Sequence, residues 1–483
     1  MNFPLYQFKF LFPFLVVVLF KSDLIGIECP TENSSSEPIC ITLGYAVERV
    51  IDDNRQIDRA VQNVDQSNLQ LVLNEAEFDL AILPHGNAGY IGGGKAGTGP
   101  TLGGGVEFYK QFTLGTKISV KPMIIKAAHD FQSQLNVKIT QPLLRGFGKF
   151  ENEAAIEAAR FTQRSAFRNL LKTKLSQILR AIQAVYDVKR TKELLALETE
   201  SYERIMKFYE KTKRKEKIGL CDSLDIYRAE MEYKQAQDAL ELSKNRYQDV
   251  KDSLKNLLEI PLDTPIEVCI PDLEYHDITL CDEEAIALAM QYRIEIYQAW
   301  DAVKESRRNA KLTKARIWPE LNLVIDFSNT GWNEEFTESF YRRRESTWGI
   351  GFTSSTDLDR TADKIAYKNS LYAIKDTERA YMELRDDIAL EVKKVLRNLE
   401  TIEARMQNLE EQVKSAKGGM LLAKIKYDRG MCSNFDVIQA EKAFQSAQVA
   451  LFTTKVEHIL SEFKLLATLG ILGNPNNLSI CCK

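Results

Sequence analysis

The chain has 483 residues, of which 44% are apolar and 27% charged, a composition typical of a folded protein rather than a disordered one. Lys and Arg number 64 and Asp and Glu 68, so the net charge is −4 and gives no general attraction to nucleic acid. With only 4 His, a His-rich metal centre is not expected, and we predict no cofactor. The low count of 13 Pro permits long helices.

Residues 1–28 have the features of a signal peptide. The apolar run Phe10–Phe20 has eleven residues, which span about 16 Å as a helix against about 30 Å of bilayer hydrocarbon. It therefore predicts an export signal, with an anchored or buried N-terminus as the alternative. Cys29 is a possible lipidation site, although Glu28 stands where a small residue is wanted.

Beyond residue 28 no apolar run approaches 18 residues, so a mature chain that crosses a membrane cannot do so as a helix. The 8 Cys contain no CxxC spacing, which argues against zinc and thioredoxin-like sites. In an exported protein, Cys29 with Cys40 and Cys269 with Cys281 are candidate disulfides, but spacing alone leaves the connectivity open.

The chain contains an internal duplication. The segment 219–240 matches 430–451 at an offset of 430 − 219 = 211, with nine identities in 22 positions. A Pro follows a helical stretch at Leu83-Pro84 and again at Trp318-Pro319. The duplication predicts two structural repeats, 42–260 and 282–470, followed by a tail at 471–483.

Each predicted repeat has the same order of elements: a helix, a strand-and-glycine region, a very long helix, a glycine turn and a returning helix. The expected ranges are 42–82, 84–145, 151–217 and 223–258 in the first repeat, and 282–317, 320–357, 361–428 and 434–469 in the second.

The two longest stretches, 151–217 and 361–428, carry the main physical signal. The first has neither Pro nor Gly over 67 residues, which corresponds to about 100 Å of helix. Apolar positions recur three and four residues apart, as at Ile178, Ile182 and Val185. Helices of this length need neighbours along their whole length, so we expect antiparallel coiled-coil hairpins that turn at Gly219 and Gly430.

The strand regions alternate between apolar and polar residues. Leu135, Val137 and Ile139 alternate with polar residues, and the same pattern occurs in 321–328 and 348–353. Such alternation is typical of membrane barrel strands and also of a soluble sheet with one buried face. We count two to three strands per half, and four to six strands cannot close a membrane barrel, whose smallest members have about eight. Strands that span a membrane here must therefore share one barrel with other copies of the chain.

In this architecture and in its motifs, the chain resembles the TolC family of outer-membrane efflux proteins. The motifs are Gln141-Pro-Leu-Leu-Arg-Gly-Phe-Gly148, the duplicated Gly-x5-Asp-x3-Ala-Glu, and Lys426-Tyr-Asp-Arg-Gly430. The resemblance covers residues 42–470. It implies a mainly α-helical protein with about four barrel strands per chain, a homotrimer with a shared twelve-stranded barrel, and a helical tunnel through the periplasm. It also implies drug efflux or type I protein secretion, together with a periplasmic adaptor and an inner-membrane transporter.

The resemblance further assigns a periplasmic tip. Gly219 and Gly430 correspond to its turns and to the adaptor contact, and Asp225, Asp436 and Tyr427 correspond to residues of a closed entrance. Asp225 and Tyr427 are expected to help hold it closed by hydrogen bonding, and carboxylates repeated around a three-fold axis are expected to favour cations. The alternative is that both Asp residues are helix caps.

Two other classes of function remain as alternatives to an export duct. One is a soluble periplasmic coiled-coil scaffold whose strands form a small sheet. The other is an enzyme, but no nucleophile motif or metal-binding helix supports catalysis, so we predict none. The basic run 211–217 is expected to be solvated rather than to bind nucleic acid.

Overall fold

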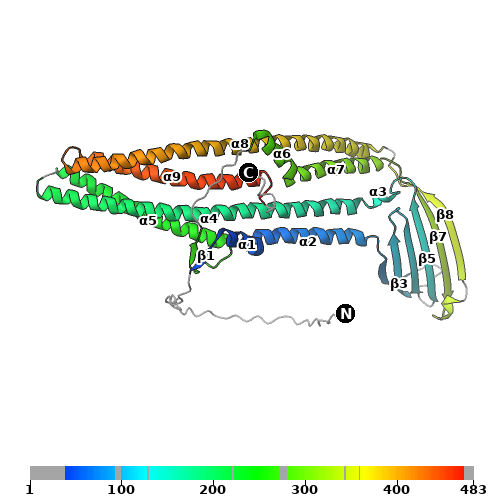
Figure 1. Cartoon of the computed structure of the whole chain (residues 1–483). Helices are drawn as coiled ribbons and strands as arrows, with labels where there is room; N and C mark the ends of the chain where they lie inside the picture. Colours follow the sequence, from blue (N-terminus) through cyan, green and yellow to red (C-terminus); the bar gives the residue numbers. More distant parts are fainter. Residues whose placement is uncertain are drawn as a thin grey trace, which may run out of the picture.

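The computed structural model describes residues 38–92, 99–127, 130–219, 222–270, 280–341, 344–357 and 359–472. The predicted signal segment, Cys29 and most of the predicted tail lie outside these residues. The described chain forms an elongated helical body, with a β-sheet at one end and two helical turns at the other (Figure 1). None of the described helices combines the length and the apolar character needed to cross a bilayer.

Helices build most of the body, in two similar sets. The first set is α1 (Leu43–Asp53), α2 (Arg55–Ala76), α3 (Lys149–Asn152), α4 (Ala154–Lys217) and α5 (Ser223–Leu257). The second set is α6 (Asp282–Tyr292), α7 (Ile294–Ala315), α8 (Thr361–Asp428) and α9 (Asn434–Thr468). A short 3-10 helix, η1 (Glu338–Phe340), precedes the last strand.

The predicted long helices are confirmed, and their apolar stripes form the core. The 64 residues of α4 make a helix about 100 Å long. On α4, Val185 and Val188 are buried against Leu254 and Leu258 at the end of α5. The corresponding stripe of α8, which includes Val392, packs against the end of α9. Each long helix therefore buries its stripe on its hairpin partner.

The shorter helices differ from the sequence prediction. The stretch 42–82 is broken at Asn54, whose extended backbone ends α1 and whose side chain caps α2 by accepting from the amides of Gln56 and Ile57. The stretch 282–317 is also broken, at Arg293, whose backbone is extended but whose side chain makes no capping bond. The first helical stretch was predicted to continue to residue 82, but α2 ends at Ala76 and strand β2 begins at Ala81.

The sheet at the end of the body has six antiparallel strands in the order β2-β3-β4-β5-β7-β8. They are β2 (Ala81–Ile91), β3 (Gly99–Gln111), β4 (Lys117–Ala127), β5 (Asp130–Pro142), β7 (Asn322–Asn333) and β8 (Arg344–Thr353). Six strands are at the upper end of the four to six counted from the sequence, and two more than the about four barrel strands that the resemblance implied. The β2–β3 hairpin was missed because its glycines interrupt the apolar alternation on which strand prediction depends.

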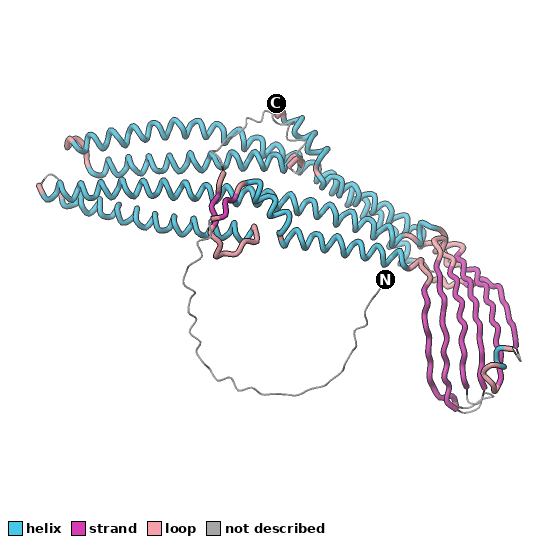
Figure 2. The backbone as a smooth tube through the Cα atoms, turned by 60° about the horizontal axis from the view of Figure 1, so that its bottom comes forward, coloured by secondary structure: helices cyan, strands magenta, loops and turns pink. Residues whose placement is uncertain are grey.

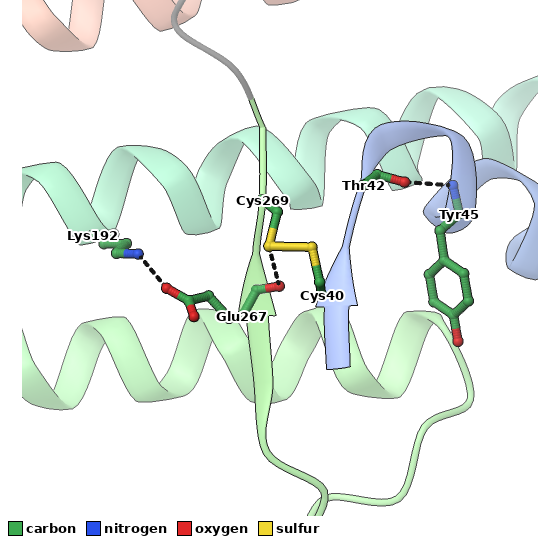
Figure 3. The surroundings of a disulfide bond; sticks show 6 residues. All are labelled: Cys40, Thr42, Tyr45, Lys192, Glu267 and Cys269. Atoms are coloured by element: carbon green, nitrogen blue, oxygen red, sulfur yellow. Dashed lines mark hydrogen bonds and ion pairs between the residues drawn. A yellow bond between two sulfur atoms is a disulfide. The ribbon is translucent and has the colours of Figure 1, made fainter. Parts of the chain in front are cut away.

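A two-stranded parallel sheet lies beside the middle of the body. In it β1 (Ile39–Ile41) pairs with β6 (Ile266–Val268), and Cys40 forms a disulfide with Cys269 (Figure 3). The candidate pairs of sequence neighbours were therefore wrong for these two cysteines, because strand pairing joins positions 229 residues apart. Lys192 of α4 holds this sheet through an ion pair of 3.0 Å to Glu267.

Candidate functional site

The two helical turns lie together at the end of the body farthest from the sheet (Figure 2). Gly219 follows α4 with a φ of +76°, and Gly430 follows α8 with a φ of +71°. The amide of Gly219 donates to the carbonyl of Glu216, and that of Gly430 to the carbonyl of Tyr427. A left-handed residue that closes a helix end in this way favours glycine, so the predicted turns are confirmed.

Tyr427 joins the two hairpins at this tip. It lies in the last turn of α8, is 5% exposed, and its hydroxyl is 3.2 Å from the hydroxyl of Thr212 on α4. The ammonium of Lys215 on α4 donates to the carbonyl oxygen of Tyr427 at 3.0 Å and lies 3.9 Å from the centre of its ring. These contacts fix the end of α8 on the end of α4.

Two further contacts cross between the hairpins. Lys211 on α4 forms an ion pair with Asp428 on α8, and this hydrogen bond holds the pKa of Asp428 below its ordinary value. The side-chain amide of Asn434, fully buried at the start of α9, donates to the backbone carbonyl of Asp225 at 2.6 Å. We call the residues of these cross-hairpin contacts the tip latch: Lys211, Thr212, Lys215, Asp225, Tyr427, Asp428 and Asn434.

The two duplicated aspartates have different local roles. Asp436 belongs to a capping box in which Ser433 accepts from the amide of Asp436 and the Asp436 carboxylate accepts from the amide of Ser433. This hydrogen bonding lowers the pKa of Asp436. Asp225 occupies the matching place in α5, but its carboxylate lies 4.0 Å from Arg228, and Asp222 at the N-cap makes no side-chain capping bond. The cap interpretation thus fits Asp436 and not Asp225.

A second set of polar contacts joins the hairpins nearer the middle of the body. Arg204 on α4 pairs with Glu441 on α9, and Lys442 on α9 pairs with Glu232 on α5 at 2.7 Å. Burial raises the pKa of Glu198 on α4, whose carboxylate accepts a hydrogen bond of 2.7 Å from the Gln445 side chain. Parting the hairpins would therefore break charged contacts at two levels.

Sequence reasoning missed most of the latch. The run 211–217 was expected to be solvated, but two of its lysines hold α8, and the tertiary contact with Tyr427 and Asp428 is not visible along the chain. The same run has five positive side chains and one negative side chain. The carboxylate of Asp225, which was expected to repeat around a three-fold axis and favour cations, therefore follows a basic segment of its own chain. The sequence did hold one usable signal. The basic run ends the first long helix, and Tyr427-Asp428 ends the second, so the duplication places them at corresponding positions.

The sheet at the other end has two chemically distinct faces, set by the cross-strand register. One face is mainly apolar and carries Ile82, Val106, Phe108, Ile118, Val120, Val137, Ile139, Ile325, Phe327, Trp348, Ile350 and Phe352. The opposite face carries His85, Glu107, Ser119, Lys121, Asn136, Lys138, Asp326, Ser328 and Thr347.

The apolar face is exposed in the single chain, whereas side chains on the polar face contact one another across strands. Trp348 is 77% exposed, and Phe352 is 69% exposed. Glu107 is 3.0 Å from the His85 ring and accepts a hydrogen bond of 2.7 Å from Ser119. One face thus suits lipid and the other suits water.

Residues 285–470 match the family profile described as "Outer membrane efflux protein". The probable efflux pump outer membrane protein TtgC of Pseudomonas putida is 21% identical over 62% of this chain, and the matched region spans 61% of its length. The outer membrane protein TolC of Vibrio cholerae is 21% identical, over 68% of this chain and 75% of its own. The alkaline protease secretion protein AprF of Pseudomonas aeruginosa is 23% identical, over 39% of each chain.

Among solved structures, the Campylobacter jejuni CmeC outer membrane channel superposes with a TM-score of 0.70 at 13% identity, over 97% of both chains, which shows a shared fold. In its fold and over residues 285–470, this chain resembles the TolC-like outer-membrane efflux proteins. The names of the matching profile and of these relatives place those proteins in the outer membrane. Within the described residues, no cluster of three or more His, Cys, Asp or Glu side chains is arranged to hold a metal ion.

Proposed function

We propose that this TolC-like chain is the outer-membrane duct of an export system and that it works as a homotrimer. The observation that carries the proposal is the two-faced sheet, whose edge strands β2 and β8 have no further strand partner among the described residues. Six strands cannot enclose a lumen, and bare strand edges in lipid cost several kcal/mol for each unpaired group. Further copies of the chain would supply the missing neighbours.

The duct is passive, and its energy comes from partners. We propose a periplasmic adaptor that contacts the tip turns at Gly219 and Gly430, and an inner-membrane transporter that drives export. The substrate is a small molecule, in line with the printed name of TtgC, or a protein, in line with that of AprF. In this assembly the segments 42–260 and 282–470 act as structural repeats, and the chain has no catalytic role.

We also propose that the tip latch keeps the periplasmic entrance closed. The latch joins the α4–α5 hairpin to the α8–α9 hairpin, so opening requires the two hairpins to part. Asp225 is the entrance carboxylate with a side chain free of capping, whereas Asp436 stabilises the start of α9.

Fractionation and single-channel recording test the proposed duct. The full chain expressed with its export signal should partition with outer membranes, require detergent for extraction, have the mass of a trimer, and form channels in planar bilayers. A water-soluble monomer without channels would contradict the proposal and favour a periplasmic scaffold. The genes beside this one then separate the substrates: a pump and adaptor indicate efflux, and a transporter beside a secreted protein indicates secretion.

A further inference from the structure

The β2–β3 hairpin is continuous with the rest of the sheet. Within the hairpin, β2 pairs with β3 from Ala81 opposite Tyr109 to Ile91 opposite Gly99. On its other side β3 pairs with β4 from Thr101 opposite Ala127 to Gln111 opposite Lys117. The hairpin is therefore joined along its length and is not a loop laid over the edge.

The hairpin also continues both faces of the sheet. Ile82 and Phe108 stand on the apolar face, in the row that continues through Val120 and reaches Trp348 at the other edge. Glu107 and His85 stand on the polar face and contact each other at 3.0 Å. A wall that separates lipid from water needs this arrangement on every strand.

The number and direction of the strands fit closure by copies of the same chain. Six antiparallel strands place the edge strands β2 and β8 in opposite directions. Under rotation about a common axis, β8 of one copy then meets β2 of the next as another antiparallel pair. Each edge strand has at least ten residues, which is the length of a tilted transmembrane strand.

We propose that the β2–β3 hairpin is part of the membrane wall, that β2 of one copy pairs with β8 of the next, and that three copies close an eighteen-stranded barrel. This inference rests on the proposed trimeric duct. It replaces the twelve strands expected from four per chain. Because barrel diameter grows about linearly with strand number, the barrel would have about 1.5 times the diameter of a twelve-stranded one. Barrels of 16–18 strands leave an open aqueous channel.

A photo-crosslinking probe distinguishes the two possible seams. The change is Trp348→p-benzoylphenylalanine in the full chain, which keeps an aromatic side chain on β8. Illumination in outer membranes should join neighbouring copies, and mass spectrometry should find the probe on a β2 peptide of the next copy. The matched control is Phe327→p-benzoylphenylalanine on the interior strand β7, which should yield links within one chain. A second probe, Ile350→p-benzoylphenylalanine, lies on the same face of β8.

The outcomes separate this inference from the proposed function. If each chain contributed only β4, β5, β7 and β8 to the barrel, β4 would be the edge strand that meets β8 of the neighbouring copy. A trimer whose β8 probes reach β4 instead of β2 would therefore overturn the eighteen-stranded wall but leave the proposed duct intact. A protein that forms no trimer in the membrane would overturn the proposed function itself. Links from β8 to β2 within a trimer would establish the seam.

Discussion

Single residues at the tip show how a duplicated sequence diverges in role. Asp225 and Asp436 occupy the same repeat position and both lie in the first turn of a helix. Ser433 precedes one of them and completes a capping box, whereas Asp222 precedes the other and makes no side-chain capping bond. Two carboxylate side chains at these positions would repel each other at short range, which disfavours the same box in the first repeat.

Removing the Tyr427 hydroxyl and the Asp225 carboxylate at the tip should open the entrance. In Asp225→Ala combined with Tyr427→Phe, the latch loses the Tyr427 hydroxyl near Thr212 and the entrance loses its carboxylate. We expect a severalfold higher single-channel conductance in planar bilayers. The control Tyr45→Phe removes a hydroxyl far from the tip and should leave conductance unchanged. Equal conductance of the double variant and the unmodified protein would count against the entrance role.

Acid should weaken the same latch. Lys211 lowers the pKa of Asp428 below its ordinary value of 3.8, so the ion pair stabilises the closed tip above about pH 4. That stabilisation is lost as the pH falls through the lowered pKa, and conductance should rise there. In Asp428→Asn, conductance should already be raised at neutral pH and should lack this acid-dependent component. A variant with the acid response of the unmodified channel would exclude Asp428 as its origin.

At the scale of elements, glycines determine where the long helices stop. α4 and α8 end beside glycines with positive φ, although α8 also contains Gly418 and Gly419 in its interior. The interior pair does not stop the helix because glycine costs only about 1 kcal/mol there and the apolar stripe continues past it.

The same substitution should therefore have opposite effects at two glycines. Gly430→Ala forces a side chain into the left-handed region and should destabilise the protein by about 1 kcal/mol. Gly418→Ala, within α8 and with open space where the added Cβ would lie, should stabilise it by up to about 1 kcal/mol. Thermal unfolding of detergent-purified protein measures both. A rise in stability for Gly430→Ala would show that the turn does not require a left-handed residue.

The two faces of the sheet should differ in their tolerance of charge. Phe327→Lys places a charge on the apolar face and should destabilise membrane insertion by about 2–4 kcal/mol if that site lies near the bilayer midplane. The control Ser328→Lys, one residue away on the polar face, should insert close to normally. The amount of folded protein in outer membranes is the measurement. Equal loss for both variants would argue against lipid on the apolar face.

At the scale of the whole molecule, one disulfide closes a loop around the first repeat. Cys40 and Cys269 are 229 residues apart, and chain-entropy arguments give about 5 kcal/mol of stabilisation for a loop of that length. Such a bond suits an oxidising compartment, which agrees with a periplasmic body.

Loss of this bond should be costly. Cys40→Ser combined with Cys269→Ser, or treatment with a reductant, should lower the unfolding temperature by several degrees. Cys281→Ala, at an exposed free cysteine whose side chain makes no capping bond, should leave it unchanged. If the double variant unfolds at the normal temperature, the disulfide does not constrain the body.

The sequence by itself determined the long helical hairpins, the duplication, the glycine turns and the alternation of β4, β5, β7 and β8. These follow from local periodicity and backbone preference, which neighbouring residues encode. Only the tertiary structure decided the β2–β3 hairpin, the Cys40–Cys269 pairing and the tip latch. Each of these features joins residues that are distant in the sequence, through strand register or through the packing of separate helices. Such contacts produce no periodic pattern within a single segment from which they could be predicted.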